Sequence, residues 1–230
     1  MRTRLDLLNR HNAMLRILLS IGGLGPAVYL IHGLSTGNLG FNPFGTLVSI
    51  TGQAGIWFLI ATLAITPLRR WLVSLCRWCR LQQGRRGADW NFLIRIRRML
   101  GLYGFFYVTL HAGVYCQLEM GWRVDLLWQD ATEKRYLWLG WLGWLMLIPL
   151  AVTSHMALRR RMGKNWRRLH RVFYIIAVVA VLHILESAKV GDRDPVLYAA
   201  ATLLLLGHRL TVAALSKLRR PEDEELEIHR

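Results

Sequence analysis

The sequence of 230 residues is poor in acidic side chains, with 14 Asp and Glu against 30 Lys and Arg. A formal net charge of +16 would suggest nucleic-acid binding if the positive side chains were spread over amphipathic elements. They are instead concentrated in blocks between long apolar runs, which is typical of a polytopic membrane protein. We therefore expect no nucleic-acid partner and expect the basic blocks to meet membrane lipid.

Cysteine is also scarce, and Cys76, Cys79 and Cys116 do not make a disulfide framework. Cys76 and Cys79 form a C-x-x-C pair, but no further metal ligands follow at a suitable spacing. The simpler interpretation is an amphipathic helix, "WLVSLCRWCRL", on the membrane surface. The sequence shows no internal repeat, no glycine-rich nucleotide loop after a strand and no evident cleavable signal peptide.

Long apolar runs are the main feature that is present, and each approaches the ~20 residues that cross a hydrocarbon layer as a helix. We predict an all-α fold, a polytopic membrane bundle of six transmembrane helices over residues 14–214. A cytoplasmic N-terminus at 1–13, a cytoplasmic insertion at 68–98 and a disordered cytoplasmic tail at 215–230 complete the expected organisation. The runs lie at about 14–34, 45–67, 99–119, 136–154, 172–188 and 195–214.

The distribution of Lys and Arg between successive loops predicts the orientation of the helices. Basic residues are dense near the N-terminus, in 68–98 and in 155–171, whereas 35–44 carries no charge and 120–135 is mixed. Basic loops remain on the cytoplasmic side of bacterial membrane proteins. This unbroken alternation predicts that both termini are cytoplasmic.

Two histidines inside the apolar runs share a predicted depth. His111 follows Arg98 by thirteen residues on the third helix, and His183 follows Arg171 by twelve on the fifth. At 1.5 Å per residue both rings lie about 18–20 Å from the inner boundary, on helices that run in the same direction. Two neutral imidazoles at one depth can hold a metal between them, and a metalloporphyrin would fill the apolar gap between the helices. The alternative is two unrelated core histidines.

His170 lies at the cytoplasmic level of the fifth helix, where the third helix carries arginine rather than histidine. It could ligate a second haem or hydrogen-bond another redox group. Arg97, Arg98 and Arg168 belong to the surrounding basic rim. Most of that rim needs only the positive-inside rule and anionic lipid as its explanation. A subset could hold haem propionates or a flavin phosphate, because arginine suits bidentate oxyanion recognition.

The remaining histidines near the membrane are interpreted as boundary residues. His32 lies at the outer end of the first helix, and His155 lies at the inner end of the fourth. His208 precedes Arg209, and we read the two as a pair that snorkels to the interface.

Four segments carry a resemblance to a known family: "TPLRR", "RIRRMLGLYGFFYVTLH", "RRRMGKNWRRLHRVFYIIAVVAVLH" and "LLLLGHRL". Over residues 14–215 or so, the chain resembles the haem-binding membrane subunit of the periplasmic methionine sulfoxide reductase system, the MsrQ (YedZ) type. More distantly it resembles the ferric reductase and NADPH oxidase transmembrane domain, in which histidines on the third and fifth of six helices hold b-type haems. It departs from that wider pattern because the third helix has no inner histidine, which argues against a standard second bis-histidine haem. No flavin/NADPH domain is appended, so the donor is expected to be a separate component.

The resemblance implies an electron-transfer subunit with one or two b haems and FMN as cofactors. His111, His170 and His183 match the family's functional histidines and are its implied metal ligands. Electrons would come from the quinone pool or a cytosolic flavin reductase and would cross the bacterial inner membrane. They would reach a periplasmic molybdopterin methionine sulfoxide reductase, whose own catalytic site repairs oxidised methionines.

Two other classes of function compete with the electron conduit. A proton or solute transporter would use His32, His111 and His183 as relay groups, and it predicts acidic partners within the spans. The six runs contain no Asp or Lys, and only Glu119 and Glu186 at their outer edges. A membrane anchor for a soluble partner leaves the depth-matched histidines without an explanation.

The charge alternation makes the first testable prediction. A C-terminal reporter that is active only in the periplasm should be inactive, because six spans with basic inner loops return the chain to the cytoplasm. The matched control places the same reporter within 120–135, where we expect activity. Activity of the C-terminal fusion would contradict the predicted orientation.

Overall fold

The computed structural model describes residues 13–189 and 191–228, and within them the chain forms helices and turns but no strand. Six helical segments are long and apolar enough to cross a membrane, which confirms the predicted all-α fold with six candidate spans. These segments are Met14–Thr36, Pro43–Trp78, Gly87–Glu119, Arg135–Val152, Lys164–Ser187 and Asp194–Leu215.

The spans are built on the helices α2 (Ala13–Thr36), α3 (Pro43–Trp78), α4 (Asn91–Val114), α6 (Arg135–Val152), α9 (Phe173–Ser187) and α10 (Asp194–Ile228). Shorter elements connect or extend them: η1 (Gly87–Trp90), η2 (Tyr115–Glu119), α5 (Val124–Glu133), α7 (Met156–Met162), α8 (Lys164–Leu169) and η3 (His170–Val172). Of these, η2 is a π-helical turn that continues α4.

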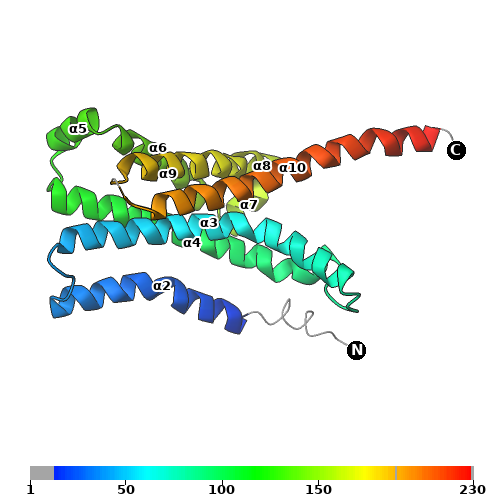
Figure 1. Cartoon of the computed structure of the whole chain (residues 1–230), viewed down its shortest axis with the longest axis horizontal. Helices are drawn as coiled ribbons and strands as arrows, with labels where there is room; N and C mark the ends of the chain where they lie inside the picture. Colours follow the sequence, from blue (N-terminus) through cyan, green and yellow to red (C-terminus); the bar gives the residue numbers. More distant parts are fainter. Residues whose placement is uncertain (1–12, 190, 229–230) are drawn as a thin grey trace.

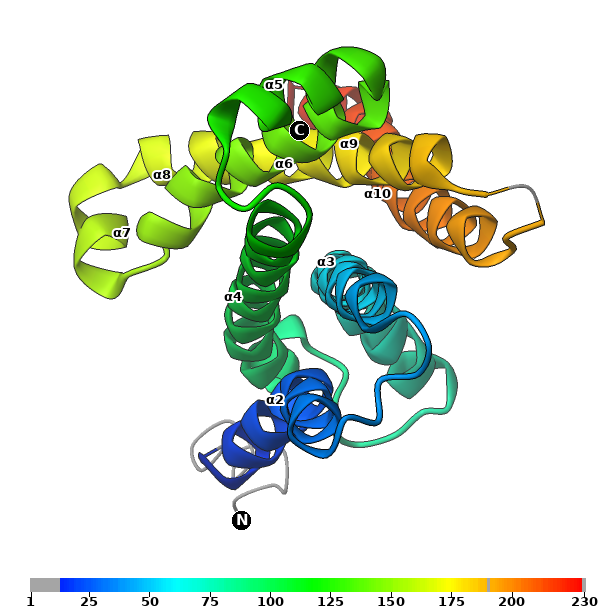
Figure 2. The same cartoon turned by 90° about the vertical axis from the view of Figure 1, so that its left-hand side faces the viewer.

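The spans run side by side along the long axis of the molecule (Figure 1). Figure 2 shows α6, α9 and α10 in one row, α3 and α4 beside that row, and α2 outermost. We call the end with the α3–α4 connection, α7 and α8 the basic end, and the opposite end the α5 end. The described start of α2 and the end of α10 both lie toward the basic end (Figure 1), as six crossings require.

Two helices extend beyond the boundaries expected from the sequence. Residues 68–78, expected in a cytoplasmic insertion with a separate surface helix, continue α3 without a break. No glycine occurs between Gly55 and Gly84, so nothing after Pro67 stops the helix until Cys79 caps it and Arg80 takes a positive φ of 51°. Cys76 is buried, whereas Cys79 is exposed. Residues 215–228, expected to be disordered, continue α10. This stretch is rich in Leu, Lys, Arg and Glu, which favour helix.

The side chain of Tyr107 from α4 is inserted into α2 next to Pro26. The Tyr107 hydroxyl donates to Gly23 O at 2.7 Å and accepts from Ala27 N at 3.2 Å, which compensates these two backbone groups within one turn. Tyr107 is fully buried, and its ring stacks on Phe58 of α3 with ring centres 5.5 Å apart. Together with the Tyr103 hydroxyl, which donates to Ser20 O at 2.8 Å, this insertion fastens α2 to α4.

A similar compensation occurs at Pro67 of α3. Pro67 has no N–H, so the carbonyl of Leu63, four residues earlier, loses its helical partner. The guanidinium of Arg209, on α10, donates to Leu63 O at 2.8 Å. This contact joins α10 to α3 inside the bundle.

The main apolar core lies among α3, α6 and α9. Its buried members are Leu59, Leu63, Leu147, Leu150, Phe173, Ile176 and Ala177. Leu63 and Phe173 place this core in the half of the bundle nearer the basic end. Toward the α5 end the same helices, with α4, diverge around a cavity.

The inserted hydroxyl of Tyr107 gives the second prediction. Tyr107→Phe should lower the free energy of unfolding by about 1–2 kcal/mol, because two backbone groups of α2 lose their partner in an apolar setting. Thermal unfolding in detergent measures this loss. Tyr29→Phe, at a 56% exposed tyrosine on α2, is the matched control and should be neutral. Equal unfolding midpoints for the two variants would contradict the role of Tyr107.

Candidate functional site

His111 of α4 and His183 of α9 face each other across the bundle. Their ring centres are 6.3 Å apart, and the ring planes are nearly perpendicular, at 84°. Both rings line a cavity of about 820 Å³ among α3, α4, α6 and α9, which extends to residues 188–189 and 191–195 at the α5 end. The structure thus brings together the two histidines that share a predicted depth.

The hydrogen bonds of the two rings determine which nitrogen carries the proton. His111 Nδ1 lies 2.9 Å from Val48 O, and His183 Nδ1 lies 2.7 Å from Tyr136 O. A carbonyl oxygen can only accept, so each Nδ1 must be the donor. In a neutral imidazole the other nitrogen, Nε2, then keeps its lone pair. Each ring therefore offers Nε2 as a ligand, oriented by a backbone bond in the way that metal-binding histidines commonly are.

Glycine allows each imidazole to reach its carbonyl. Gly52 lies four residues after Val48, and Gly140 lies four residues after Tyr136. A Cβ atom on Gly52 would come within 3.1 Å of His111 Nδ1, and one on Gly140 within 2.9 Å of His183 Cε1. The same carbonyl-and-glycine arrangement thus supports both rings, from α3 on one side and from α6 on the other.

The donor set fits a metal cofactor that brings further ligands of its own. Two imidazoles with ring centres 6.3 Å apart, each with the lone pair of Nε2 left over, could together hold such a group. Among the described residues no three His, Cys, Asp or Glu side chains gather, whereas a protein-only zinc site needs four ligands. Haem supplies four nitrogens of its own, and the cavity volume is in the usual range for a cofactor.

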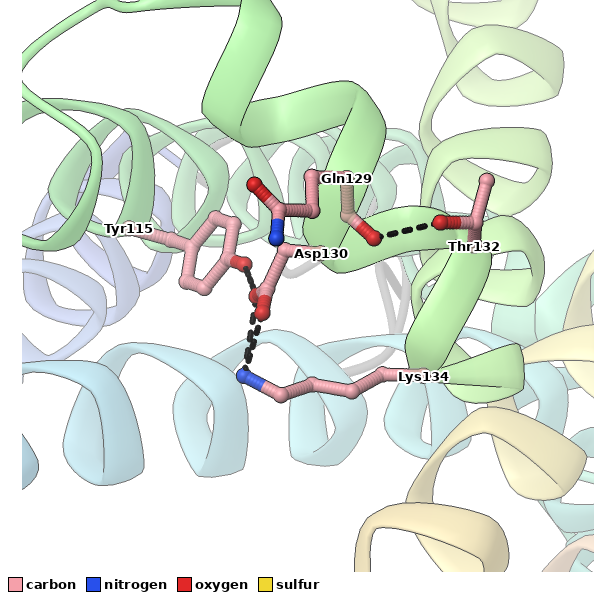
Figure 3. Close-up of polar contacts among 5 residues, drawn as sticks. All are labelled: Tyr115, Gln129, Asp130, Thr132 and Lys134. Carbon is pink, nitrogen blue, oxygen red and sulfur yellow. Dashed lines mark hydrogen bonds and ion pairs between the residues drawn. The ribbon is translucent and has the colours of Figure 1, made fainter.

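Polar side chains bond to one another at the α5 end of the bundle (Figure 3). Tyr115, at the start of η2, donates to Asp130 of α5, and Lys134 Nζ lies 2.7 Å from Asp130 Oδ1. Tyr115 and Lys134 both line the cavity. Partial burial alone would raise the pKa of Asp130, but the bonds from Lys134 and Tyr115 outweigh it and hold the pKa below its usual value. The ionised carboxylate therefore ties α5 to η2 and to the start of α6.

His170 lies at the basic end and does not line this cavity. Its ring stacks on Trp166 with centres 4.1 Å apart, and its Nε2 lies 3.2 Å from Thr153 Oγ1. The Thr153 hydroxyl donates to Pro149 O at 2.6 Å, so its oxygen accepts from His170 Nε2. In contrast to His111 and His183, His170 has Nε2 engaged and Nδ1 free.

The arginines named from the sequence separate into two groups. Arg97 is half-buried, and its Nη1 lies 3.4 Å from Thr66 Oγ1 of α3. Arg98 and Arg168 are exposed. Of the three, only Arg97 therefore reaches into the bundle.

The expectation that Arg209 snorkels to the interface is wrong. Arg209 is half-buried and donates to Leu63 O and to Tyr174 of α9, because Pro67 leaves that carbonyl without its helical donor. The signal in the sequence was a proline inside a span, which implies a carbonyl four residues earlier that needs a donor.

The other boundary histidines have local roles. His208 accepts from Trp71 Nε1 at 3.1 Å, and His155 accepts from Ala157 N as the N-cap of α7. His32 is exposed. Within the described residues none of the three faces the His111–His183 cavity.

A protein-family model described as "Ferric reductase like transmembrane component" matches residues 51–181 of the chain, more than half of its length. The matched segment includes His111 and His170 and ends two residues before His183. No solved structure matches the chain.

The glycine contacts give the third prediction. Gly140→Ala should weaken haem binding by about tenfold, because the new methyl group displaces the His183 ring from Tyr136 O. Haem content and the EPR spectrum of the ferric protein, which responds to the angle between the ligand rings, measure the effect.

Gly207→Ala in α10 is the matched control. Its Cβ atom would have no neighbour within 4 Å, and Gly207 does not line the cavity, so it should bind haem as the unchanged protein does. Equal haem content and EPR spectra in both variants would refute the role of Gly140.

Proposed function

Because the chain belongs to the family of ferric reductase-like transmembrane components, we propose that it is a b-haem electron-transfer subunit of the bacterial inner membrane. Membrane electron transfer is the general function that the family membership indicates, and six apolar helices make the chain a multi-pass membrane protein. In the specific proposal, electrons come from the quinone pool or a cytosolic flavin reductase. They leave for a periplasmic molybdopterin methionine sulfoxide reductase that repairs oxidised proteins.

The observation that carries the proposal is the pair of oriented imidazoles. His111 and His183 each donate Nδ1–H to a backbone carbonyl, which leaves the lone pair on Nε2, and both rings line the shared cavity. When bound there, haem b supplies an iron that gains and loses one electron. The protein's part is to keep both ligand nitrogens unprotonated, to hold the rings at one separation and to surround them with apolar side chains.

The apolar core supports electron transfer over the transporter alternative. A proton relay needs titratable groups or water along its whole path. Between the cavity and the basic end, α3, α6 and α9 bury leucine, phenylalanine and isoleucine side chains. An electron can cross such a layer between redox groups, whereas a proton cannot.

The basic end is the proposed side of electron entry. His170 lies there, with no hydrogen-bond partner for Nδ1 among the described residues. Arg97 is near its ring, and Arg98 and Arg168 are exposed. We assign His170 to a second redox group, either as a ligand of a second haem or as a hydrogen-bond partner of FMN. The arginines would bind propionate or phosphate oxygens.

The α5 end is the proposed side of electron exit. The lining of the His111–His183 cavity includes Tyr115, Lys134 and residues 188–189 and 191–195 at this end. With the predicted orientation, this end faces the periplasm and the molybdopterin partner. The assignment to methionine sulfoxide repair rests on the four sequence segments that resemble the MsrQ type.

Substitution of the histidines gives the fourth prediction. His111→Ala or His183→Ala should remove or strongly weaken a low-spin b-haem spectrum, because each leaves the iron without one axial nitrogen. His170→Ala should keep this spectrum but slow its reduction by a physiological donor from the basic side, while dithionite reduces it normally. Visible spectra of anaerobic membranes measure both effects.

His32→Ala is the matched control and should change neither spectrum nor rate. Wild-type haem spectra in both His111→Ala and His183→Ala would refute the pairing. Unchanged donor-driven rates in His170→Ala would refute its role in entry.

A further inference from the structure

We propose that Arg97 and Arg209 form an oxyanion-binding site inside the basic half of the bundle, which takes the phosphate or carboxylate group of a bound ligand. The identity of that ligand rests on the proposed function. The site adds Arg209 and Tyr174 to the residues assigned to the side of electron entry. The site lies where α3, α4, α9 and α10 meet.

The two guanidinium groups contact the same turn of α3, one from α4 and the other from α10. Arg97 of α4 donates to Thr66, and Arg209 of α10 donates to Leu63, three residues earlier. Residues three apart on a helix lie on the same side. Each guanidinium is consequently within Coulombic range of the other.

An aromatic ring lies beside the Arg209 guanidinium, and further positive charges lie around it. The guanidinium is 5.0 Å from the ring centre of Tyr174, which stands at the start of α9, four residues after His170. Arg97 is within Coulombic range of the His170 ring, and the exposed Arg70 is within range of Arg209. A ligand with a flat ring and an anionic group, arriving from the basic end, would meet both kinds of contact.

These two charges have no counter-charge in the described part of the chain. Neither guanidinium forms an ion pair with a described carboxylate, and the Arg123–Asp125 and Lys134–Asp130 pairs lie at the α5 end. In addition, Nε of Arg209 is buried without a hydrogen-bond partner. Two like charges in an apolar bundle repel each other and are costly to desolvate. An oxyanion would offset both charges and accept the unpaired N–H.

A purely structural role explains only part of this arrangement. Leu63 O needs a donor because of Pro67, but a neutral side chain such as glutamine could supply one. The need for a donor does not account for a positive charge placed next to Arg97. This distinction makes the two roles of Arg209 separable by experiment.

The test compares FMN with riboflavin, which has the same ring system but lacks the phosphate. The protein is placed in phosphatidylcholine nanodiscs, and quenching of flavin fluorescence gives both affinities. Arg209→Gln keeps a donor for Leu63 O and removes the charge, whereas Arg209→Lys keeps the charge. Arg161→Gln, at an exposed arginine of α7, controls for loss of one positive charge at the basic end.

We expect the unchanged protein, Arg209→Lys and Arg161→Gln to bind FMN at least about tenfold more tightly than riboflavin, as a charge-assisted contact allows. Arg209→Gln should lose this preference while keeping its haem spectrum and unfolding midpoint. Equal binding of the two flavins by the unchanged protein, or an unaltered preference in Arg209→Gln, would exclude FMN as the ligand of the site. The proposal would then depend on the lipid measurement described next.

A lipid arm distinguishes the source of the oxyanion. Phosphatidylglycerol is added to the nanodiscs, and its retention and its competition with FMN are measured. Retention that depends on Arg209 assigns the site to a lipid phosphate and upholds it. If neither FMN nor phosphatidylglycerol binding depends on Arg209, the site does not exist. A haem spectrum lost in His111→Ala or His183→Ala tests the electron-transfer function separately from either result.

Discussion

In an apolar layer without water, each backbone and side-chain polar group must find its partner inside the protein. This constraint accounts for the contacts on which the structure depends. The Tyr107 hydroxyl bridges an opened turn of α2, and Arg209 donates to the carbonyl that Pro67 leaves unpaired in α3. His111 and His183 follow the same rule, because each donates Nδ1–H to a helix carbonyl. For the histidines, satisfying the rule also produces chemistry, since the nitrogen that remains is a ligand.

The cavity depends on where small residues occur in the facing helices. Gly52 and Gly140 bring α3 and α6 close to the imidazoles, so the rings are held by backbone rather than by other side chains. Nearer the basic end, the same helices bury large apolar residues and close the bundle. One set of helices therefore lines a cavity in one half and packs an apolar core in the other.

The two ends of the bundle differ in how their charges are balanced. At the α5 end, Asp130 neutralises Lys134 and accepts from Tyr115. At the basic end, Arg97 and Arg209 reach inward with no described carboxylate to balance them. The two ends therefore differ in electrostatic character, and an anionic group is attracted to the basic end rather than to the α5 end.

The number of spans and the shared depth of His111 and His183 followed from the sequence alone, because apolar run length and rise per residue are local properties of a helix. The extension of α3 over 68–78 and of α10 over 215–228 did not follow from the sequence, since charged stretches next to a span can be either loop or helix. Gly52, Gly140 and Arg209 could not be assigned in advance, because their roles depend on which helix lies opposite. The apolar composition of the runs and the positions of the histidines within them determined that His111 and His183 would lie inside a helical bundle. Only the tertiary structure decided which ring nitrogen carries the proton and which keeps its lone pair, because that depends on carbonyls from neighbouring helices.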